Sequence, residues 1–456
     1  MKIIIVGCGK VGTNIAEELS KENHDLVLFD KHNLIVQELS NSLDALGVIG
    51  DAGSLSDLKE AGVENSDLLL AVTSSDETNM LCCLFARKLN PNIKTIARVR
   101  NPIYSIKEVN YIKNELGLTS VINPEMATAR EIFRSLRLPQ AMKVETFSRG
   151  RVELITFAVE EGNSLENKLV KDVSKDFNSK VIFVGIERDN EILIPHGNTK
   201  ILKDDKLSII AETSEMIKFF AQTGLHKNPI KSVFMCGGSA IATYLASMLL
   251  RAGIKVKIVE RDKEKCSQLA DRLPEASIIW GDATNNNLLL EEGVSDADAF
   301  ISLTNVDEEN VMLSLFVRNL ADIKVVTKVN HIAYDSVMSK LDVGSVVYPK
   351  HITADYILSY VRGLSNAASS SNITALYRIL NNKAEAMTFK INSESRVTSK
   401  KLKELNFIDD LLICSIIRND EVLTPNGDDT IEVGDTVLIV TSNMGIDSIE
   451  ETLKNE

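Results

Sequence analysis

An internal repeat constrains the fold of this 456-residue chain more than any other feature of its sequence. Residues 1–19, MKIIIVGCGKVGTNIAEEL, match residues 230–249, IKSVFMCGGSAIATYLASML, and the match places Gly7 opposite Gly237. The same register continues through four further segments, which begin with LVLFDK, VIGDAG, IARVRN and VINPEM in the first copy. Chance does not give so many matches at a nearly constant offset, so the sequence predicts a duplicated unit.

The repeat extends beyond this first part of each half. Residues 185–211 resemble residues 415–441, with Pro195 opposite Pro425. The chain therefore alternates an N-type unit and a C-type unit twice. We expect four domains, with N-type units at residues 1–140 and 227–366 and C-type units at residues 141–226 and 367–456.

The N-type units show the pattern of a doubly wound α/β fold. Short apolar runs such as KIIIV, DLVLF and LLLAV alternate with helical stretches, which indicates a parallel sheet covered on both faces. In the helical stretch TNIAEELSK, the residues Ile15, Ala16 and Leu19 predict one buried face. The C-type units show alternating strands, a hairpin-like turn at ERDNE or RNDE, and a helix start at SLENKLVKDV. They predict two small α+β domains.

Residues 232–250 carry no charge and are long enough to cross a bilayer. Their repeat partner, however, contains charged residues such as Lys10 and Glu17, which a spanning segment would not tolerate. We therefore expect a strand, a turn at Gly237 and a buried helix. The start of the chain also lacks the pattern of a signal peptide, so a cytoplasmic protein is expected.

Composition argues against several classes of function. The formal net charge is −13, and nucleic-acid binding needs a basic face, so no nucleic-acid partner is expected. The six cysteines show no CxxC spacing, which indicates reduced and mostly buried thiols. The six histidines form no HxxxH or HExxH cluster, so the sequence gives no support for a metal site.

A glycine loop points to a dinucleotide ligand. Residues 7–12, GCGKVG, follow a predicted strand and precede a predicted helix, and Asp30 lies 18 residues further on. In this pattern Gly7 permits the tight turn, Gly9 lets a pyrophosphate approach the backbone, and Gly12 lets the helix pack on the strand. The helix N-terminus directs free N–H groups at the phosphates, and Asp30 favours the 2′-hydroxyl of NAD(H). The alternative is a fold that keeps its packing glycines but has lost its ligand.

Polar residues at the carboxyl ends of the other strands complete the predicted site. Arg98 and Arg100 fall on one strand face and suit a pyrophosphate clamp. Alternatively, Asp51 or Ser54 caps the third helix, and Asp76 caps the fourth. The candidate residues of the first site are Gly7, Cys8, Gly9, Lys10, Val11, Gly12, Asp30, Lys31, Asp51, Ala52, Thr73, Ser74, Asp76 and Arg98.

The second copy departs from the fingerprint. Ala242 replaces Gly12, which the pattern tolerates, but Ser239 replaces Gly9 and adds a side chain where the phosphates would approach. The Ser239 hydroxyl group could also donate to a phosphate, so the sequence leaves open whether a second site binds. Its candidate residues are Gly237, Gly238, Ser239, Ala240, Ile241, Glu260, Asp282, Thr304 and Lys328.

The two halves together resemble the TrkA family, the regulatory subunits of Trk potassium-uptake systems. The resemblance rests on IIIVGCGKVG, LVLFDK, VIGDAG, AVTSSDETNM and IARVR, and on the order of the units. It implies two nucleotide-binding RCK-N domains that alternate with two RCK-C domains, and NAD(H) or ATP and ADP as regulatory ligands. It further implies a homo-oligomeric ring, expected to be a tetramer, on the cytoplasmic face of a potassium-conducting membrane subunit. The family's nucleotide contacts fall on residues 7–11, Asp30, Thr73, Ser74 and Arg98, with Lys10 near the phosphates.

Two further features leave alternatives open. In related ATP-binding RCK proteins an acid after the crossover proline helps to hold a cation; Glu125 matches it, but its counterpart here is Lys350, which argues against a paired cation site. The apolar edges of residues 127–138 and 353–364 fit either an assembly surface or an intramolecular core. A regulatory subunit, rather than an enzyme, is the expected function. The alternatives are an NAD-dependent dehydrogenase, for which no catalytic group recurs in both halves, and a scaffold with vestigial nucleotide sites.

Overall fold

The computed structural model contains two compact units, each built from one pair of repeated domains. One unit comprises Met1–Leu136 and Ile230–Leu358, and the other comprises Arg137–Pro229 and Ser359–Glu456. The structure describes residues 1–21, 24–100, 106–138, 141–147, 151–189, 191–225, 230–330, 341, 343–368, 373–380, 383–398, 400–419, 421–446 and 448–454.

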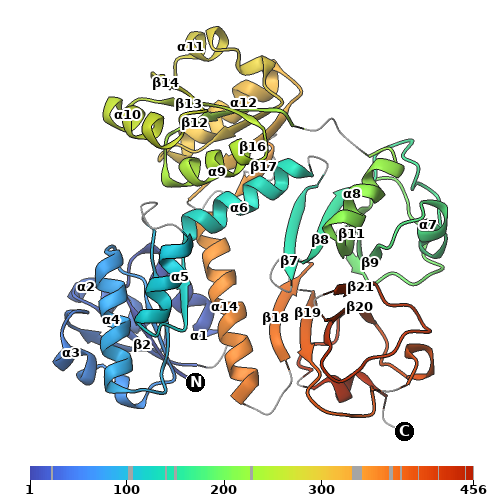
Figure 1. Cartoon of the computed structure of the whole chain (residues 1–456), viewed down its shortest axis with the longest axis horizontal. Helices are drawn as coiled ribbons and strands as arrows, with labels where there is room; N and C mark the ends of the chain where they lie inside the picture. Colours follow the sequence, from blue (N-terminus) through green and yellow to red (C-terminus); the bar gives the residue numbers. More distant parts are fainter. Residues whose placement is uncertain are drawn as a thin grey trace. The chain divides into compact units, whose positions relative to one another are not determined.

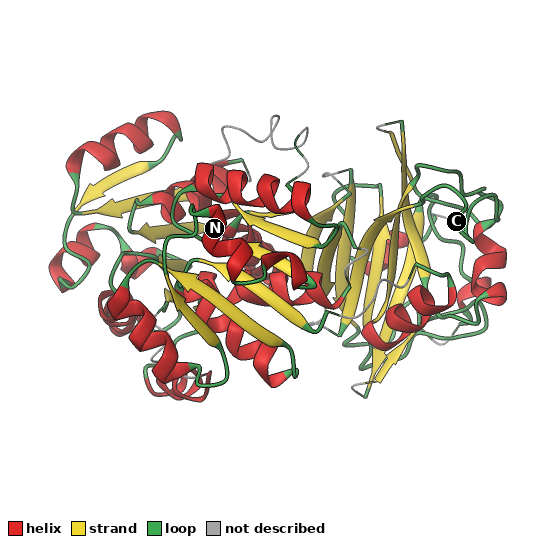
Figure 2. Cartoon of the chain, turned by 90° about the horizontal axis from the view of Figure 1, so that it is seen from above, coloured by secondary structure: helices red, strands yellow, loops and turns green. Residues whose placement is uncertain are grey.

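The first N-type unit is a Rossmann-like domain with a parallel six-stranded sheet in the order β3-β2-β1-β4-β5-β6. The central strands β1 and β4 are buried along almost their whole length, because helices cover both faces (Figures 1 and 2). The strands are β1 (Lys2–Val6), β2 (Asp25–Asp30), β3 (Leu46–Ile49), β4 (Leu68–Ala71), β5 (Lys94–Arg98) and β6 (Ser120–Ile122). The helices are α1 (Lys10–Ser20), α2 (Asn33–Ser42), α3 (Leu55–Glu60), α4 (Asp76–Leu89), α5 (Ile106–Glu115) and α6 (Pro124–Arg137).

The second N-type unit repeats this topology, with the strand order β14-β13-β12-β15-β16-β17. The strands are β12 (Ser232–Cys236), β13 (Lys255–Glu260), β14 (Ser277–Trp280), β15 (Ala299–Ser302), β16 (Lys324–Lys328) and β17 (Ser345–Val347). The helices are α9 (Ala240–Arg251), α10 (Lys263–Arg272), α11 (Asn286–Glu291), α12 (Asp307–Leu320) and α14 (Pro349–Ala368). The predicted doubly wound fold is thus confirmed for both copies.

The uncharged residues 232–250 form the strand β12, a turn and most of the helix α9, as predicted. The turn is at Gly237, whose φ of +101° favours glycine. Among the helices in the described part of the chain, none combines the length and apolar character that a membrane crossing requires.

The helix α6 joins the two Rossmann-like domains. Its residues Ala129, Ile132 and Leu136 share a hydrophobic core with Val233 and Leu245 of the second domain, and Figure 1 shows α6 beside that domain. Of the two alternatives for residues 127–138, the structure shows the intramolecular core. One consequence is that both glycine loops belong to a single packed unit.

The C-type units are antiparallel five-stranded sheets in equivalent orders, β10-β9-β11-β8-β7 and β21-β20-β22-β19-β18. The strands of the first are β7 (Lys143–Phe147), β8 (Val152–Ala158), β9 (Ile182–Arg188), β10 (Glu191–Leu193) and β11 (Lys206–Glu212), with helices α7 (Val170–Asp176) and α8 (Thr213–Gln222). The strands of the second are β18 (Ile373–Ile379), β19 (Ala384–Lys390), β20 (Leu411–Arg418), β21 (Glu421–Leu423) and β22 (Thr436–Thr441).

The predicted hairpins of the C-type units are present, whereas one helix start was placed too early. The hairpins turn at Asp189 and Asn419, with φ values of 52° and 50°. The stretch SLENKLVKDV begins with turns, and α7 starts only at Val170. The two sheets also share one hydrophobic core, to which Phe147 and Val440 contribute.

Candidate functional site

Two glycines of the first loop are required by the packing of the chain itself. Gly7 has a φ of +100°, and a side chain there would begin 2.8 Å from the backbone nitrogen of Thr73. A Cβ atom on Gly12 would lie 1.9 Å from the carbonyl oxygen of Gly7. These positions therefore let the strand turn sharply into α1 and let the helix lie close to it, whether or not a ligand binds.

Gly9 is different, because nothing in the described protein fills the space beside it. A Cβ atom built on Gly9 would have no heavy atom within 4 Å, and its φ of −74° suits any residue. Gly9 is also the N-cap of α1, and no side chain caps that helix. The free N–H groups of the first turn and the open space above Gly9 together form a place for an anion.

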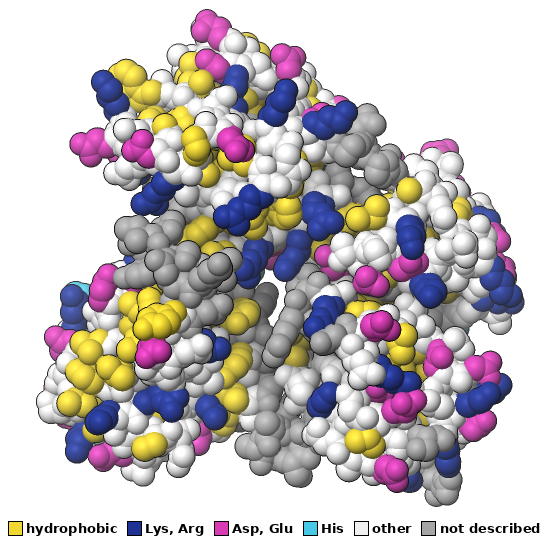
Figure 3. Space-filling model, in the orientation of Figure 1, with side chains coloured by type: hydrophobic (Ala, Val, Ile, Leu, Met, Phe, Trp, Pro, Cys, Tyr) yellow, Lys and Arg dark blue, Asp and Glu magenta, His cyan; other side chains and the backbone are white. Residues whose placement is uncertain are grey.

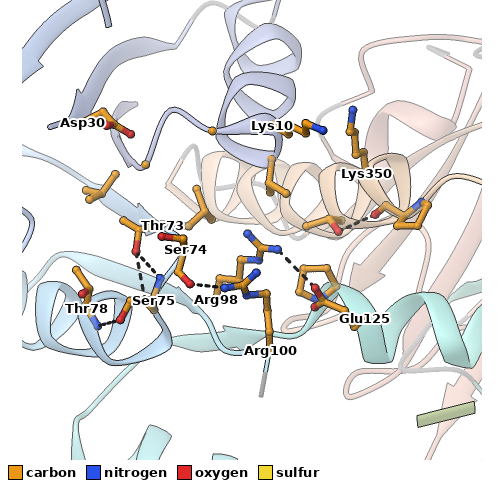
Figure 4. Close-up of a pocket in the computed structure, with 18 of the residues that line it drawn as sticks. Lys10, Asp30, Thr73, Ser74, Ser75, Thr78, Arg98, Arg100, Glu125 and Lys350 are labelled. Carbon is orange, nitrogen blue, oxygen red and sulfur yellow. Dashed lines mark hydrogen bonds and ion pairs between the residues drawn. The ribbon is translucent and has the colours of Figure 1, made fainter. Parts of the chain in front are cut away.

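A cavity of about 830 Å³ lies in front of this loop (Figure 4), within the usual size range of small-molecule sites. Side chains from the carboxyl ends of β1, β2, β4 and β5 line it, as expected for a ligand site of an open α/β sheet. The predicted first-site residues that line the cavity are Gly7, Gly9, Lys10, Val11, Asp30, Lys31, Asp51, Ala52, Thr73, Ser74 and Arg98. Cys8, Gly12 and Asp76 are not among the described residues that line it.

The backbone holds the carboxylate of Asp30 in a fixed orientation. Its Oδ2 atom accepts a hydrogen bond from the N–H of Cys8 at 2.7 Å, and its Oδ1 atom accepts one from the N–H of His32 at 2.9 Å. Each carboxylate oxygen can accept a second hydrogen bond. Asp30 can therefore receive a ribose hydroxyl group while it also orders the glycine loop.

Arg98 and Arg100 both line the cavity, as their spacing predicted. A guanidinium nitrogen of Arg98 lies 3.6 Å from the Glu125 carboxylate, and the buried Nε atom of Arg98 has no hydrogen-bond partner in the described protein. Burial lowers the pKa of Arg98 and raises the pKa of Glu125, the latter against the attraction of Arg98. Arg98 as a whole lines the cavity, and its guanidinium charge suits an anionic ligand.

Asp76 does not cap α4, which corrects one of the alternatives drawn from the sequence, and it is not among the described residues that line the cavity. Ser75 is the N-cap and accepts the N–H of Thr78 at 3.1 Å. Asp76 instead accepts the backbone N–H of Arg100 at 2.9 Å and lies 3.7 Å from its side chain. Its carboxylate thus positions Arg100 beside the cavity. In α3 the cap is Ser54, one of the two residues considered for that role.

Two asparagines that the sequence argument missed hold the strand ends at each glycine loop. The fully buried Asn79 accepts hydrogen bonds from the N–H and hydroxyl groups of Thr73 at 2.8 and 2.7 Å, and donates to the carbonyl of Arg98 at 2.9 Å. Asn310 accepts a hydrogen bond from the N–H of Thr304 at 2.9 Å and donates to the carbonyl of Lys328 at 3.0 Å, whereas the Thr304 hydroxyl group donates to the carbonyl of Val306. Their identity in both copies, in SSDETNM and NVDEENV, was the available signal.

The second glycine loop is closed by its own side chains. The Ser239 hydroxyl group accepts the N–H of Ala242 at 3.4 Å and so caps α9. Glu260 is only 8% exposed, and its two oxygens accept the N–H groups of Gly238 and Asp262 at 2.7 and 2.8 Å.

Four of the second-site candidates line the same cavity as the first loop, namely Ser239, Ala240, Ile241 and Lys328. The other candidates, Gly237, Gly238, Glu260, Asp282 and Thr304, are not among its described lining residues. The exposed Asp282 carboxylate accepts the N–H and hydroxyl groups of Thr284 at 2.9 and 2.8 Å. The structure therefore assembles one cavity from two loops.

These features place the chain in a structural class. The GsuK RCK domain has the same fold, with a TM-score of 0.62 and 17% identity over 99% of this chain and 93% of that chain. The GsuK channel bound to NAD shares this fold, with a TM-score of 0.63 and 17% identity over 99% of this chain and 77% of that chain. A GsuK structure bound to ADP aligns with 79% of this chain and 69% of that chain, with a TM-score of 0.50 and 16% identity.

Within this class, the chain belongs to the TrkA family. The TrkA-N domain matches residues 3–124 and 233–349, and the TrkA-C domain matches residues 154–224 and 386–454. The Trk system potassium uptake protein TrkA homolog of Archaeoglobus fulgidus is 32% identical over 100% of both chains.

Proposed function

We propose that this protein is the regulatory subunit of a Trk-type potassium transporter and binds NAD(H), or ADP and ATP at the same site, on its first glycine loop. The observation that carries the proposal is the unfilled space at Gly9, which opens onto a cavity lined by cationic side chains. Membership of the TrkA family supports the transport system as the process that is regulated.

The site chemistry supports a ligand with an adenosine diphosphate moiety. Asp30 can accept the ribose hydroxyl groups and repels a 2′-phosphate, which favours NAD(H) over NADP. Arg98 and the first turn of α1 suit the two phosphates. Structures of the GsuK channel with NAD and with ADP share this fold, and both ligands contain the same adenosine diphosphate part.

The proposed role is regulatory and involves no catalytic step. A nucleotide in this cavity would contact both Rossmann-like domains, so its binding free energy depends on how these domains are arranged. A ligand controls such an arrangement only if it binds one state more tightly than another. We propose that this difference is passed to the potassium-conducting membrane subunit, and that the chain works in the cytoplasm at the inner face of the membrane.

We further propose that the chain acts as a homo-oligomeric ring, expected to be a tetramer. Large hydrophobic side chains are exposed at equivalent positions of the two N-type units, Leu81 on α4 and Met312 on α12, and Leu84 is also exposed on α4. Figure 3 shows hydrophobic side chains gathered on the visible face of the first Rossmann-like domain. Such a patch supports self-association. The proposed domain limits remain those at residues 140, 226 and 366.

The test is potassium flux through the Trk membrane subunit reconstituted with this protein, measured with and without NADH or ADP. Asp30→Ala and Gly9→Asp should each abolish nucleotide binding and the nucleotide response. Gly9→Asp should fold normally, because the space beside Gly9 is empty. Asp25→Ala is the matched control, since Asp25 lies at the opposite, amino end of the same strand. Unchanged responses in both loop variants would refute the proposal.

A further inference from the structure

The two halves contribute unequal parts to the shared cavity. On the first half, the lining includes the region after β2 and β3, with Asp30, His32 and Ala52, where an adenosine would lie. The equivalent region of the second half, around Glu260 and Asp282, is absent from the described lining residues. The cavity therefore has a surface for an adenosine on one side only.

The second half instead contributes positive charge. Lys328, at the end of β16, is only 4% exposed, and its Nζ atom has one long contact, 3.5 Å to the carbonyl of Leu303. Lys350 lies in the first turn of α14 and lines the cavity beside Lys10 of the first half. Figure 4 shows the side chains of Lys10 and Lys350 approaching one another. Within the part of the chain that the structure describes, no ion pair joins Lys10, Lys328 or Lys350 to a carboxylate.

An anion between Lys10 and Lys350 would reduce the repulsion between their charges. Burial and the nearby charge of Lys10 lower the pKa of Lys350, against the attraction of Asp307 and Glu17. Burial likewise lowers the pKa of Lys328, against the attraction of Asp307 and Glu125. The described lining around the phosphate end contains five cationic groups, Lys10, Arg98, Arg100, Lys328 and Lys350, and the carboxylate of Glu125. Behind this lining, Asp76 lies 3.7 Å from Arg100, and Asp307 attracts Lys328 and Lys350. This excess of positive charge matches a chain of phosphates.

We propose that the second half has no nucleotide site of its own and instead binds, through Lys328 and Lys350, the phosphates of the nucleotide held by the first half. The inference rests on the proposed function and makes it more specific. Each chain binds one adenine nucleotide, the first half recognises the adenosine, and the second half recognises the charge of the phosphate chain. Ligands that share adenosine but differ in phosphate charge then act differently on the contact between the halves.

The experiment is calorimetric titration of the full-length protein with ADP, together with adenosine measured by competition. The wild-type protein should bind one ADP per chain. Lys350→Met and Lys328→Met should each weaken ADP binding by about tenfold or more, because a charge-assisted hydrogen bond is lost. Adenosine affinity should change by less than twofold. Lys265→Met, which removes an exposed lysine of the second half outside the cavity, is the control for altered surface charge.

The outcomes separate this inference from the proposed function. Two ADP molecules per chain, or one ADP bound with wild-type affinity by both lysine variants, would overturn the inference and leave nucleotide regulation standing. Equal weakening of adenosine and ADP would also overturn it, since the lysines would then act through the fold. Lys350→Met, at a partly exposed position, decides the question should the buried Lys328→Met variant not fold. No binding of ADP or NADH to the wild-type protein would overturn both proposals.

Discussion

The hydroxyl group of Tyr244, on the second glycine-loop helix α9, donates a hydrogen bond to the backbone carbonyl of Arg100 at 3.1 Å. The same hydroxyl group accepts a hydrogen bond from the side chain of Asn123 at 3.0 Å. Arg100 and Asn123 flank the cavity on the first half, so Tyr244 fastens the two Rossmann-like domains together next to the candidate site.

Removal of this hydroxyl group should weaken the contact between the halves. Tyr244→Phe should lower the free energy of unfolding by about 0.5–1.5 kcal/mol, the usual net value of one or two hydrogen bonds. The fluorescence of Trp280, the single tryptophan of the chain, can follow urea unfolding of the second domain. Tyr111→Phe is the control, because Tyr111 is exposed on α5. Equal urea midpoints for both variants would contradict the assigned role.

The two glycines at the ends of the first helix turn should respond differently to the same substitution. Gly12→Ala should cost about 1–3 kcal/mol of stability, because the new methyl group meets the carbonyl of Gly7. Gly9→Ala should change the free energy of unfolding by less than about 0.5 kcal/mol but weaken NADH binding. Thermal unfolding and NADH titration of both variants test this. A destabilised Gly9→Ala protein would contradict the assignment, because a methyl group in open space should not disturb the fold.

The buried asparagine of the second domain should be structural. Asn310→Ala leaves the N–H of Thr304 and two carbonyl groups without their partners, so the loss of stability should reach at least about 2 kcal/mol. Urea unfolding followed by Trp280 fluorescence measures it, with Asn287→Ala on the exposed side of α11 as the control. A loss no larger than that of the control would refute this assignment.

Glu125 should make stability depend on pH. Burial raises its pKa above the usual value of 4.5, and Asp76 adds to this, whereas Arg98 and Arg100 oppose it. Between 4.5 and the raised pKa, the folded protein keeps a proton that the unfolded chain has lost. The contribution of Glu125 to stability therefore falls as the pH rises through this window, and is constant above it.

Glu125→Gln should remove this dependence. The difference in unfolding free energy, wild type minus variant, should decline from pH 4.5 upward and then level off. Urea unfolding of both proteins across that range gives this difference. The contributions of the other titrating groups are the same in both proteins and cancel. A difference that rises with pH would mean that attraction to Arg98 outweighs burial.

The fold was predictable from the sequence because its causes are local and repeated. Buried parallel strands require continuous apolar runs, and α1 requires apolar residues on one face, so Ile15, Ala16 and Leu19 could be assigned correctly as buried. Because residues 232–250 are the repeat partner of the first strand, turn and helix, the same structure could be predicted for them, although their composition alone also allowed a membrane span. The start of α7 was misplaced because the turn residues before Val170 have a helix-like composition.

The candidate site was predictable only in part, because several contacts depend on how the two halves pack. The sequence showed which residues follow each strand, and most of the first-half candidates line the cavity. It could not show that Lys328 and Lys350 share this cavity with Lys10, since that depends on the packing between the halves. The cap of α4 was misassigned to Asp76, because a carboxylate at a helix start can cap, bind a ligand or hold a neighbouring loop, and Ser75 caps this helix instead.

The most direct test of the account is a crystal structure of the full-length protein with ADP or NADH. The account predicts one nucleotide per chain, with its ribose at Asp30, its first phosphates above Gly9, and Lys328 and Lys350 facing the phosphate end. A nucleotide bound at the second loop beside Glu260, or a cavity left empty at saturating nucleotide, would contradict it.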